Sequence, residues 1–301
     1  MVPLRVILAV LCVKNYPRHS EYNCPIMAKN EDSKVTAAEV WGTYLNRGYY
    51  PESIHTPWFA RKSMRPLFRL LPSEPRCPID YYPFQGIGGA LVRLFLGITP
   101  SKMNPRLCNL CDQAAKKYQG GAEVETSLLF ADIRGSTSIA ETMKPADFSE
   151  LINRFYDVTT KVVINTNGMI EKLVGDEVTA FYVPGIAGPE HAGVAVEAAR
   201  TILGETQHGS SAGPWVPVGV GIHTGKAWIG SVRSEEGMTD IAVLGDVANV
   251  AARLASQAGP GEILISEATR SAAGVERDGL EFRHLALKGR AEPVDAWTLR
   301  S

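Results

Sequence analysis

An apolar run that ends on a carboxylate limits most strongly what this chain can fold into. Residues 128–131 are Leu, Leu, Phe and Ala, which predicts a short buried strand, and Asp132 follows directly. Gly135, Ser136 and Thr137 come next, and a Ser or Thr beside Gly is typical of a helix start. A strand that delivers an acid to a helix N-terminus can place a hard oxygen ligand for Mg²⁺ beside N–H groups that face phosphate oxygens. Acids are also common helix caps, so this stretch alone leaves both interpretations open.

A second acid lies at the tip of a predicted hairpin. Apolar residues flank Gly175 and Asp176 on both sides, which is typical of two short strands joined by a tight turn. Turn chemistry alone would account for Asp176. Two acids at strand ends of one small domain could also share a pair of metal ions in a phosphoryl-transfer site.

The periodicity of the apolar residues predicts further elements. Helical spacing indicates helices at 145–164 and 246–256. Short apolar runs indicate strands at 216–222, 227–232, 261–265 and 294–299. Alternating strands and helices of this kind indicate an α/β or α+β sandwich.

Five motifs of this chain, in this order, resemble those of the class III nucleotidyl (adenylate/guanylate) cyclases. They lie at residues 130–137, 172–177, 221–225, 244–254 and 287–289. The resemblance covers roughly residues 123–301, and five ordered motifs are far more specific than any one of them. It implies an α+β fold with a ferredoxin-like β-α-β-β-α-β core and one antiparallel sheet.

The resemblance also implies a reaction and a metal site. In the family, the ribose 3′-oxygen of a nucleoside triphosphate attacks the α-phosphate and pyrophosphate leaves, assisted by two Mg²⁺ or Mn²⁺ ions per site. Asp132 and Asp176, with the backbone carbonyl of Ile133, match the residues that bind these ions. The residues that match the family's triphosphate contacts are Gly135, Ser136, Thr137 and Lys288.

Asn249 and Arg253 match the family's transition-state pair. The amide would orient the ribose, and the guanidinium would meet the charge that develops on the α-phosphoryl group. Their spacing of four residues puts both side chains on one face of the predicted helix. The alternative is an ordinary helix face on which Arg253 makes a surface ion pair. Because Asn is mildly unfavourable inside a helix, we favour the functional interpretation.

Lys172 matches the residue that reads the purine edge in adenylate-specific members of the family. Its usual partner, an Asp or Thr seven residues before the catalytic Asn, is replaced by Ala242, whose methyl group cannot hydrogen-bond to a base. Base choice would then depend on Lys172, on backbone groups or on neighbours such as Asp240. A lysine donor fits adenine N1, whereas guanylate-specific members usually carry an acid there, so the resemblance favours ATP.

The implied function is an adenylate cyclase that converts ATP to 3′,5′-cyclic AMP and pyrophosphate for intracellular signalling. A guanylate cyclase, or a non-catalytic cyclase-like module that binds nucleotide and dimerises, is the alternative. A diguanylate cyclase would need Gly-Gly before the acid, whereas this chain has Val174 and Gly175. In the family, the acids of one protomer face the Asn and Arg of the other. Because this chain carries both halves, a homodimer with two shared sites is implied.

Charge is distributed unevenly along the 301 residues. Residues 1–121 carry 16 Lys and Arg against 8 Asp and Glu, whereas the remainder carries 15 against 24. This asymmetry predicts a basic N-terminal module at 27–121, for which a regulatory role is open, and a catalytic domain at 122–301, with a mobile tail at 1–26. Solvated surfaces of different composition are the alternative. We expect no nucleic-acid partner.

The sequence predicts no integral membrane segment. Its longest apolar run, residues 6–13, is well short of the roughly 20 residues that a span needs. The chain has five cysteines, an odd number, which fits a reducing cytoplasm better than a disulfide framework.

The cysteines also raise the question of a second metal. Cys108 and Cys111 form a Cys-x-x-Cys pair, and Cys77 with Asp80 could complete four zinc ligands. Three thiols with one acid are an unusual ligand set, so buried structural thiols are the alternative.

Overall fold

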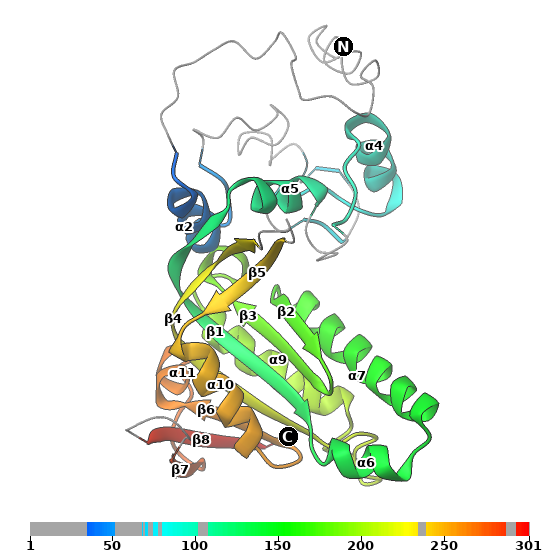
Figure 1. Ribbon diagram of the computed structural model, residues 1–301, viewed down its shortest axis with the longest axis vertical. Coiled ribbons are helices and arrows are strands. Elements are labelled where there is room, and N and C mark those ends of the chain that lie inside the picture. Colours follow the sequence, from blue (N-terminus) through cyan, green and yellow to red (C-terminus); the bar gives the residue numbers. More distant parts are fainter. Residues whose placement is uncertain are drawn as a thin grey trace, which may run out of the picture. The chain divides into compact units, whose positions relative to one another are not determined.

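The structure is a computed structural model that describes most of the chain (Figure 1). The described residues are 35–51, 68, 70–71, 75–77, 80–101, 108–233, 239–286 and 293–300. Only the backbone is described for residues 112, 115, 116, 233, 239 and 240.

The chain divides into two compact units. The first comprises Met1–Thr36 and Pro51–Ala114, and the second comprises Ala37–Tyr50 and Ala115–Ser301. The module boundary predicted between residues 121 and 122 falls inside a strand, β1 (Gly120–Ile133), so the structure divides the chain a few residues earlier. The second unit also contains the helix α2 (Ala37–Arg47), where the Trp41 indole donates a hydrogen bond of 2.8 Å to the Tyr118 carbonyl.

The first unit contains the helix α4 (Gly86–Leu96) and the start of α5 (Asn109–Lys117). Isolated β-bridges join Arg76 to Pro83 and Pro100 to Cys108. The fully buried ring of Tyr82 packs edge to face on Phe68, with 4.6 Å between the ring centroids. The buried side chains Phe68, Tyr82 and Phe84, together with Val92 of α4, therefore belong to the described core of this unit.

The second unit alternates helices and strands. After β1 the elements are α6 (Ser136–Thr142), α7 (Pro145–Asn165), β2 (Met169–Val174), β3 (Glu177–Tyr182), α8 (Pro184–Ala187), α9 (His191–Glu205), β4 (Val218–Arg233), β5 (Thr239–Leu244), α10 (Asp246–Gln257), β6 (Glu262–Ser266), α11 (Glu267–Ala272), β7 (Glu281–Leu285) and β8 (Val294–Arg300).

The described strands form one eight-stranded sheet in the order β2-β3-β1-β4-β6-β8-β7, with β5 paired to β4 (Figure 1). Its first half is the unit β1-α7-β2-β3-α9-β4, whose strands pair antiparallel in the order β2-β3-β1-β4. This confirms the expected α+β fold with a ferredoxin-like β-α-β-β-α-β core. Beyond it, β6 joins β4 as a parallel neighbour.

The two faces of the sheet carry different helices. Residues 129, 131 and 133 of β1 pack into one core with Phe155 of α7 and the apolar side of α9. On the opposite face, Leu254 of α10 packs with Leu264 of β6 in a separate cluster. Because side chains alternate along a strand, Asp132 lies on the face that α10 covers.

The predicted helices at 145–164 and 246–256 are confirmed as α7 and α10. The strand predictions were less complete. Residues 216–222 and 227–232 belong to the single strand β4, since residues 223–225 continue the pairing with β1. The strands β5 and β7 were not predicted. None of the helices in the described ranges is both long and apolar enough to cross a bilayer.

Candidate functional site

The two acids predicted to bind metal are brought together by the β2–β3 turn. Asp132 is the second-last residue of β1, and the turn at Gly175 and Asp176 ends beside it. The backbone N–H of Ile133 donates to the Asp176 carbonyl at 3.2 Å. Gly175 has a φ of +62°, a conformation that glycine adopts without a steric cost. Gly175 therefore allows the tight turn that places Asp176 beside the end of β1.

Glu177 adds a third carboxylate that the sequence analysis did not assign a role. It lies directly opposite Asp132 in the antiparallel pairing of β1 and β3, so both side chains share one face of the sheet. Burial raises the pKa of the Glu177 carboxyl, and the neighbouring charge of Asp176 raises it further, against the opposite effect of Arg134. Three acids at one strand end form a strongly negative site, which favours a cation.

Arg134 is the cation that the structure places there. Its guanidinium forms an ion pair with Asp132 and donates a hydrogen bond of 3.2 Å to the carbonyl of Ser256 in α10. Its backbone N–H donates to the Pro217 carbonyl at 2.8 Å. Burial lowers the pKa of Arg134, while the charges of Asp176 and Glu177 raise it. The sequence motif contains Arg134, but only the folded arrangement shows that it pairs with Asp132 and lies near the charges of Asp176 and Glu177.

Gly135, Ser136 and Thr137 open the helix α6, as predicted, but with a different cap. Gly135 is the N-cap residue, with a φ of 70°, and no side chain accepts a capping hydrogen bond. The expectation of a Ser or Thr cap is therefore wrong, because Gly135 already makes the left-handed turn from β1 into the helix. The first residue of α6, Ser136, comes four residues after Asp132.

Asn249 and Arg253 lie on the side of α10 that faces away from the sheet. The buried residues of this helix are Val247, Val250, Ala251, Leu254 and Ala255. Asn249 is exposed and Arg253 is half-buried. Among the described hydrogen bonds and ion pairs, none links either side chain to the three acids.

The two positions expected to recognise the purine base, Lys172 and Ala242, lie on β2 and β5. Lys172 lies half-exposed on β2, and its ammonium is 3.9 Å from a carboxylate oxygen of Glu171. Glu171 lies at a β-bulge in the pairing of β2 with β3. Its nearly buried carboxylate accepts a hydrogen bond of 3.3 Å from the backbone N–H of Val243, the residue after Ala242. A carboxylate therefore lies beside the position where Ala242 offers only a methyl group.

Two residues of the sequence hypothesis lie outside what the structure describes. Lys288 belongs to the undescribed range 287–292, and Asp240 is described by its backbone alone.

A cavity of about 510 Å³ lies between α10 and the strand ends that follow it, where His223, Asp246, Glu267 and His284 line it together with other residues. None of the predicted site residues that the structure describes lines this cavity.

The four predicted zinc ligands do come together. Cys77, Asp80, Cys108 and Cys111 are all buried, and one ligand atom from each lies within 4.8 Å of the others. The three cysteines form no disulfide.

Comparisons with known proteins agree with this arrangement of elements. The chain is 28% identical to an adenylate cyclase of Anabaena cylindrica over 184 residues, which is 58% of this chain and 36% of that protein. It is 30% identical to adenylate cyclase 1 of Rhizobium meliloti over 184 residues, 58% of this chain and 27% of that protein. The matched segment thus spans about a third of the length of these curated relatives.

Two solved structures share the fold. The adenylyl cyclase CyaB from P. aeruginosa matches with a TM-score of 0.53 and 26% identity, over 60% of this chain and 96% of that one. The guanylyl cyclase Cya2 matches with a TM-score of 0.53 and 28% identity, over 60% of this chain and 93% of that one.

The family model of the adenylate and guanylate cyclase catalytic domain matches residues 120–299, which begin with β1 and end within β8. This is more than half of the chain, and it contains all the elements that position Asp132, Asp176 and α10. The chain therefore belongs to the adenylate and guanylate cyclase catalytic-domain family.

Proposed function

We propose that this protein is an adenylate cyclase that converts ATP to 3′,5′-cyclic AMP and pyrophosphate. In this reaction the ribose 3′-oxygen forms a bond to the α-phosphorus, the bond from that phosphorus to the bridging oxygen breaks, and the hydroxyl proton is released. The observation that carries the proposal is the juxtaposition of Asp132 and Asp176 at the end of β1. Ile133 would add its backbone carbonyl to the same site.

The donor set fits a pair of Mg²⁺ or Mn²⁺ ions. Carboxylate and carbonyl oxygens are the ligands that these hard cations prefer, and the ion pair of Arg134 with Asp132 supports the attraction of this site for positive charge. Bound there, the ions would neutralise charge on the triphosphate and ease the loss of the 3′-hydroxyl proton. Asp132 and Asp176 would hold them in place.

Other residues would act on the nucleotide directly. Gly135, Ser136 and Thr137 would donate backbone N–H groups to phosphate oxygens, and Lys288 would contact the triphosphate. Asn249 would orient the ribose, and Arg253 would stabilise the charge that develops on the α-phosphoryl group.

The functional unit in this proposal is a homodimer. Asn249 and Arg253 lie on the face of α10 that points away from their own sheet, which supports a role toward a second chain. In a two-fold dimer each site would combine Asp132 and Asp176 of one chain with Asn249 and Arg253 of the other. A cytoplasmic location, where ATP is made and thiols stay reduced, belongs to the same proposal.

ATP is the preferred substrate in this proposal because Lys172 is a donor at the purine position. Adenine presents an acceptor at N1 and a donor at its amino group. The ammonium of Lys172 would donate to N1, and the carboxylate of Glu171, 3.9 Å away, would accept from the amino group. Relatives that are named adenylate cyclases support this choice.

GTP is the second candidate, because the same pair of side chains could also bind guanine. Guanine presents an acceptor at O6 and a donor at N1, which Lys172 and Glu171 would also match. Ala242 offers no polar atom that would discriminate between the two bases, and Cya2 is a guanylyl cyclase. A cyclase-like module that binds nucleotide without turnover is the remaining alternative.

The test is to incubate the purified full chain with Mn²⁺ and either ATP or GTP and to quantify both cyclic nucleotides. We expect cyclic AMP to form with the higher kcat/KM. Asp132→Asn should lower the rate by at least about 10²–10³-fold, because it removes a negative metal ligand at constant side-chain size. Asp157→Asn, on the exposed side of α7, is the matched control and should keep the wild-type rate.

The other outcomes separate the candidates. A higher kcat/KM with GTP would make the protein a guanylate cyclase. Binding of ATP without any cyclic product, under Mg²⁺ and Mn²⁺ alike, would leave the non-catalytic module. Wild-type activity in Asp132→Asn would contradict the assignment of the metal site itself.

A further inference from the structure

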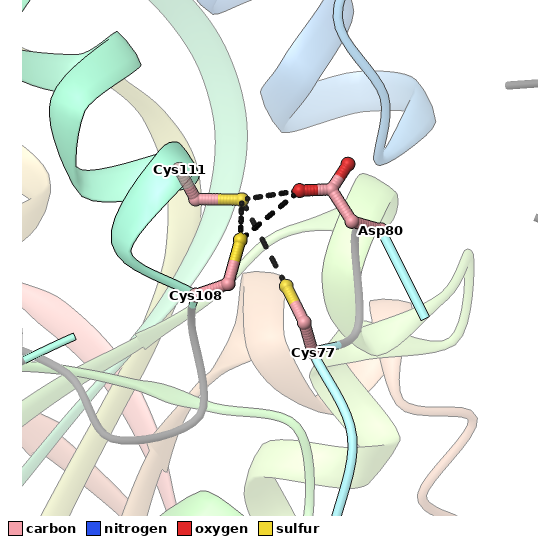
Figure 2. Close-up of side chains that lie close together, drawn as sticks. All are labelled: Cys77, Asp80, Cys108 and Cys111. Atoms are coloured by element: carbon pink, nitrogen blue, oxygen red, sulfur yellow. Dashed lines mark hydrogen bonds between the residues drawn. The ribbon is translucent and has the colours of Figure 1, made fainter. Parts of the chain in front are cut away.

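Cys77, Asp80, Cys108 and Cys111 form a Cys/Asp cluster in the first unit. None of these residues has a role in the proposed cyclase reaction. The members of the cluster come from two stretches of chain: Cys77 and Asp80 from one loop, and Cys108 and Cys111 from the start of α5. Figure 2 shows the three sulfurs and one carboxylate oxygen pointing toward one common centre. All four residues are buried, with 6% exposure for Asp80 and at most 2% for the cysteines.

The distances between these atoms match the edges of a small tetrahedron. Cys111 Sγ lies 3.8 Å from Cys77 Sγ and 3.5 Å from Cys108 Sγ. The Asp80 oxygen lies 3.2 Å from the sulfurs of both Cys108 and Cys111. A tetrahedral Zn²⁺ about 2.3 Å from each sulfur and about 2.0 Å from an oxygen separates two sulfurs by about 3.8 Å and a sulfur from the oxygen by about 3.5 Å. The cluster is therefore already close to the size that a single ion requires.

Backbone hydrogen bonds stabilise the loop that contains Cys77 and Asp80. Cys77 N–H donates to the Tyr82 carbonyl and Tyr81 N–H donates to the Cys77 carbonyl, both at 2.9 Å. Closing this loop requires Tyr81 at a φ of 61°, which is uncommon and unfavourable for a bulky residue. Such a conformation persists only where its surroundings enforce it, and here it brings the Tyr82 carbonyl back to the N–H of Cys77.

The second stretch is fixed as well. The backbone N–H of Asn109 donates to the Thr99 carbonyl at 2.9 Å, and Cys108 bridges to Pro100. Cys111 follows in the first turn of α5. The Cys-x-x-Cys pair is thus held at both ends, so the four ligand atoms need no rearrangement of the backbone to converge.

Charge also argues for a cation in this cluster. Asp80 is a buried carboxylate that accepts hydrogen bonds from the thiols of Cys108 and Cys111, and burying a carboxylate charge is costly unless it is paired. A divalent ion would neutralise Asp80 and provide the counter-charge for thiolates. Four protein ligands also leave no open position, which is typical of structural and not catalytic zinc.

We propose that Cys77, Asp80, Cys108 and Cys111 bind one structural Zn²⁺ that ties the 77–82 loop to the start of α5. A cluster of several irons does not fit, because bridging sulfides would hold the protein ligands further apart than 4.8 Å. The site does not depend on the proposed cyclase activity.

The test measures metal in the full chain, expressed in zinc-supplemented medium and purified without chelator. We expect about one zinc per chain by mass spectrometry, and less than about a tenth of that in Cys108→Ser. Cys24→Ser is the matched control: it removes a cysteine outside the cluster and should keep the metal. Asp80→Asn, which replaces an anionic ligand, should release zinc to a colorimetric chelator at least about tenfold faster.

A second measurement avoids dependence on whether the variants fold. Wild-type protein grown with Co²⁺ in place of zinc should show the intense visible bands of a tetrahedral site and the near-ultraviolet band of cobalt–thiolate bonds. Zinc-free protein that also takes up no Co²⁺ would overturn the proposal. So would iron at one equivalent in place of zinc, a Cys108–Cys111 disulfide in the native protein, or retention of zinc in Cys108→Ser.

Discussion

Arg134 shows how a single side chain can balance part of the charge of a negatively charged site. Its guanidinium pairs with Asp132, and the charges of Asp176 and Glu177 act on it from the neighbouring turn and strand. Both members of the ion pair are mostly buried, at 17% and 21% side-chain exposure. A divalent ion bound by Asp132 would have to compete with this guanidinium.

We therefore expect Arg134→Gln to lower the stability of the protein without metal and to increase its affinity for Mn²⁺. Loss of the pair should lower the free energy of unfolding by about 1 kcal/mol without metal. The same change should lower the Mn²⁺ concentration at half-saturation by about fivefold, since about 1 kcal/mol of competition is removed. Thermal melting over a Mn²⁺ titration measures both effects.

Arg200→Gln is the control for this variant, because Arg200 pairs with Glu197 at 3.4 Å on an exposed part of α9. It should change neither stability nor the response to Mn²⁺ appreciably. An equal Mn²⁺ dependence in Arg134→Gln and the wild type would show that Arg134 does not compete for the site.

At the scale of residues, the sequence predicts the acids better than their neighbours. Asp132 and Asp176 stand out because each follows an apolar run at a strand end. The environments of Glu177 and Glu171 depend on cross-strand register, on a β-bulge and on the approach of β5 to β2. No local pattern in the sequence encodes those contacts, so these residues emerged only from the structure.

Among the elements, α10 depends on glycine for its position. Gly221 in β4 lies directly beneath the helix, and a Cβ at this position would lie 2.1 Å from the Ala255 nitrogen and 2.5 Å from the Ala251 carbonyl oxygen. Backbone atoms cannot move aside as a flexible side chain does. The close approach of α10 to β4, which carries Asn249 and Arg253 with it, therefore requires glycine here.

Gly221→Ala should accordingly destabilise the protein by at least about 2 kcal/mol, because it overpacks the contact between α10 and β4. Urea unfolding at pH 7 measures the change. Gly204→Ala is the control: Gly204 lies in α9 with nothing within 4 Å of the added Cβ, so the change should stabilise by about 0.5–1 kcal/mol. Similar stabilities of Gly221→Ala and the wild type would disprove the tight packing.

The strands β6, β8 and β7, at one end of the sheet, are joined by an ionic cluster around Glu262. Its carboxylate accepts two hydrogen bonds of 2.8 Å from Arg283 and one of 3.0 Å from Arg300. The hydrogen bonds from Arg283 lower the pKa of Glu262 from its ordinary value of 4.5 to about 2, against the opposing effect of burial, with the Gly259 N–H and Arg300 lowering it further. Folding thus favours the ionised form of this carboxyl.

The pH dependence of this contribution follows from the lowered pKa. As the pH falls, the unfolded chain takes up the proton before the folded one, so the stabilisation is present above about pH 4.5 and is lost as the pH falls toward about 2. The stability difference between wild type and Glu262→Gln, from urea unfolding at several pH values, should shrink over that range. Glu141→Gln, at an exposed position of α6, is the control. A difference that stays constant down to the lowest pH at which the protein folds would contradict the assignment.

At the scale of elements, the long periodic helices were predictable and the edge strands were not. The helices α7 and α10 bury one continuous face, so their apolar spacing is visible in the sequence. In β7, by contrast, most side chains are exposed, including the apolar Phe282, so no buried face marks the strand. The continuity of β4 depends on its 14 paired positions along β1, which lie far away in the sequence.

For the whole molecule, the sequence contains both halves of the proposed active site, but no hydrogen bond or ion pair among the described residues of one chain joins them. The acids lie at the end of β1, whereas Asn249 and Arg253 point away from the sheet on α10. The proposed dimer therefore needs a test that involves two chains, and a mixture of two variants that are each inactive provides one.

In the proposed dimer, Asp132→Ala and Arg253→Ala should each be nearly inactive alone, because each removes one half of both sites. Losing a transition-state stabiliser costs about 10²–10³ in rate, and losing a metal ligand costs as much or more. In a heterodimer of the two variants, one site inherits both defects, and the other combines wild-type Asp132 with wild-type Arg253. Random pairing makes about half of the dimers mixed, so the mixture should recover roughly a quarter of wild-type activity.

The measurement uses co-expression of the two variants with different affinity tags, so that tandem purification isolates the mixed dimers. Their activity per dimer should then approach half of the wild-type value, since one of two sites is intact. Mixed dimers of Asp132→Ala and Asp176→Ala are the control: both substitutions damage the metal half of a site, so neither interface regains a complete set and activity should stay at the parental level. If purified Asp132→Ala and Arg253→Ala heterodimers are as inactive as their parents, each site is built within one chain, and the dimeric arrangement proposed here is incorrect.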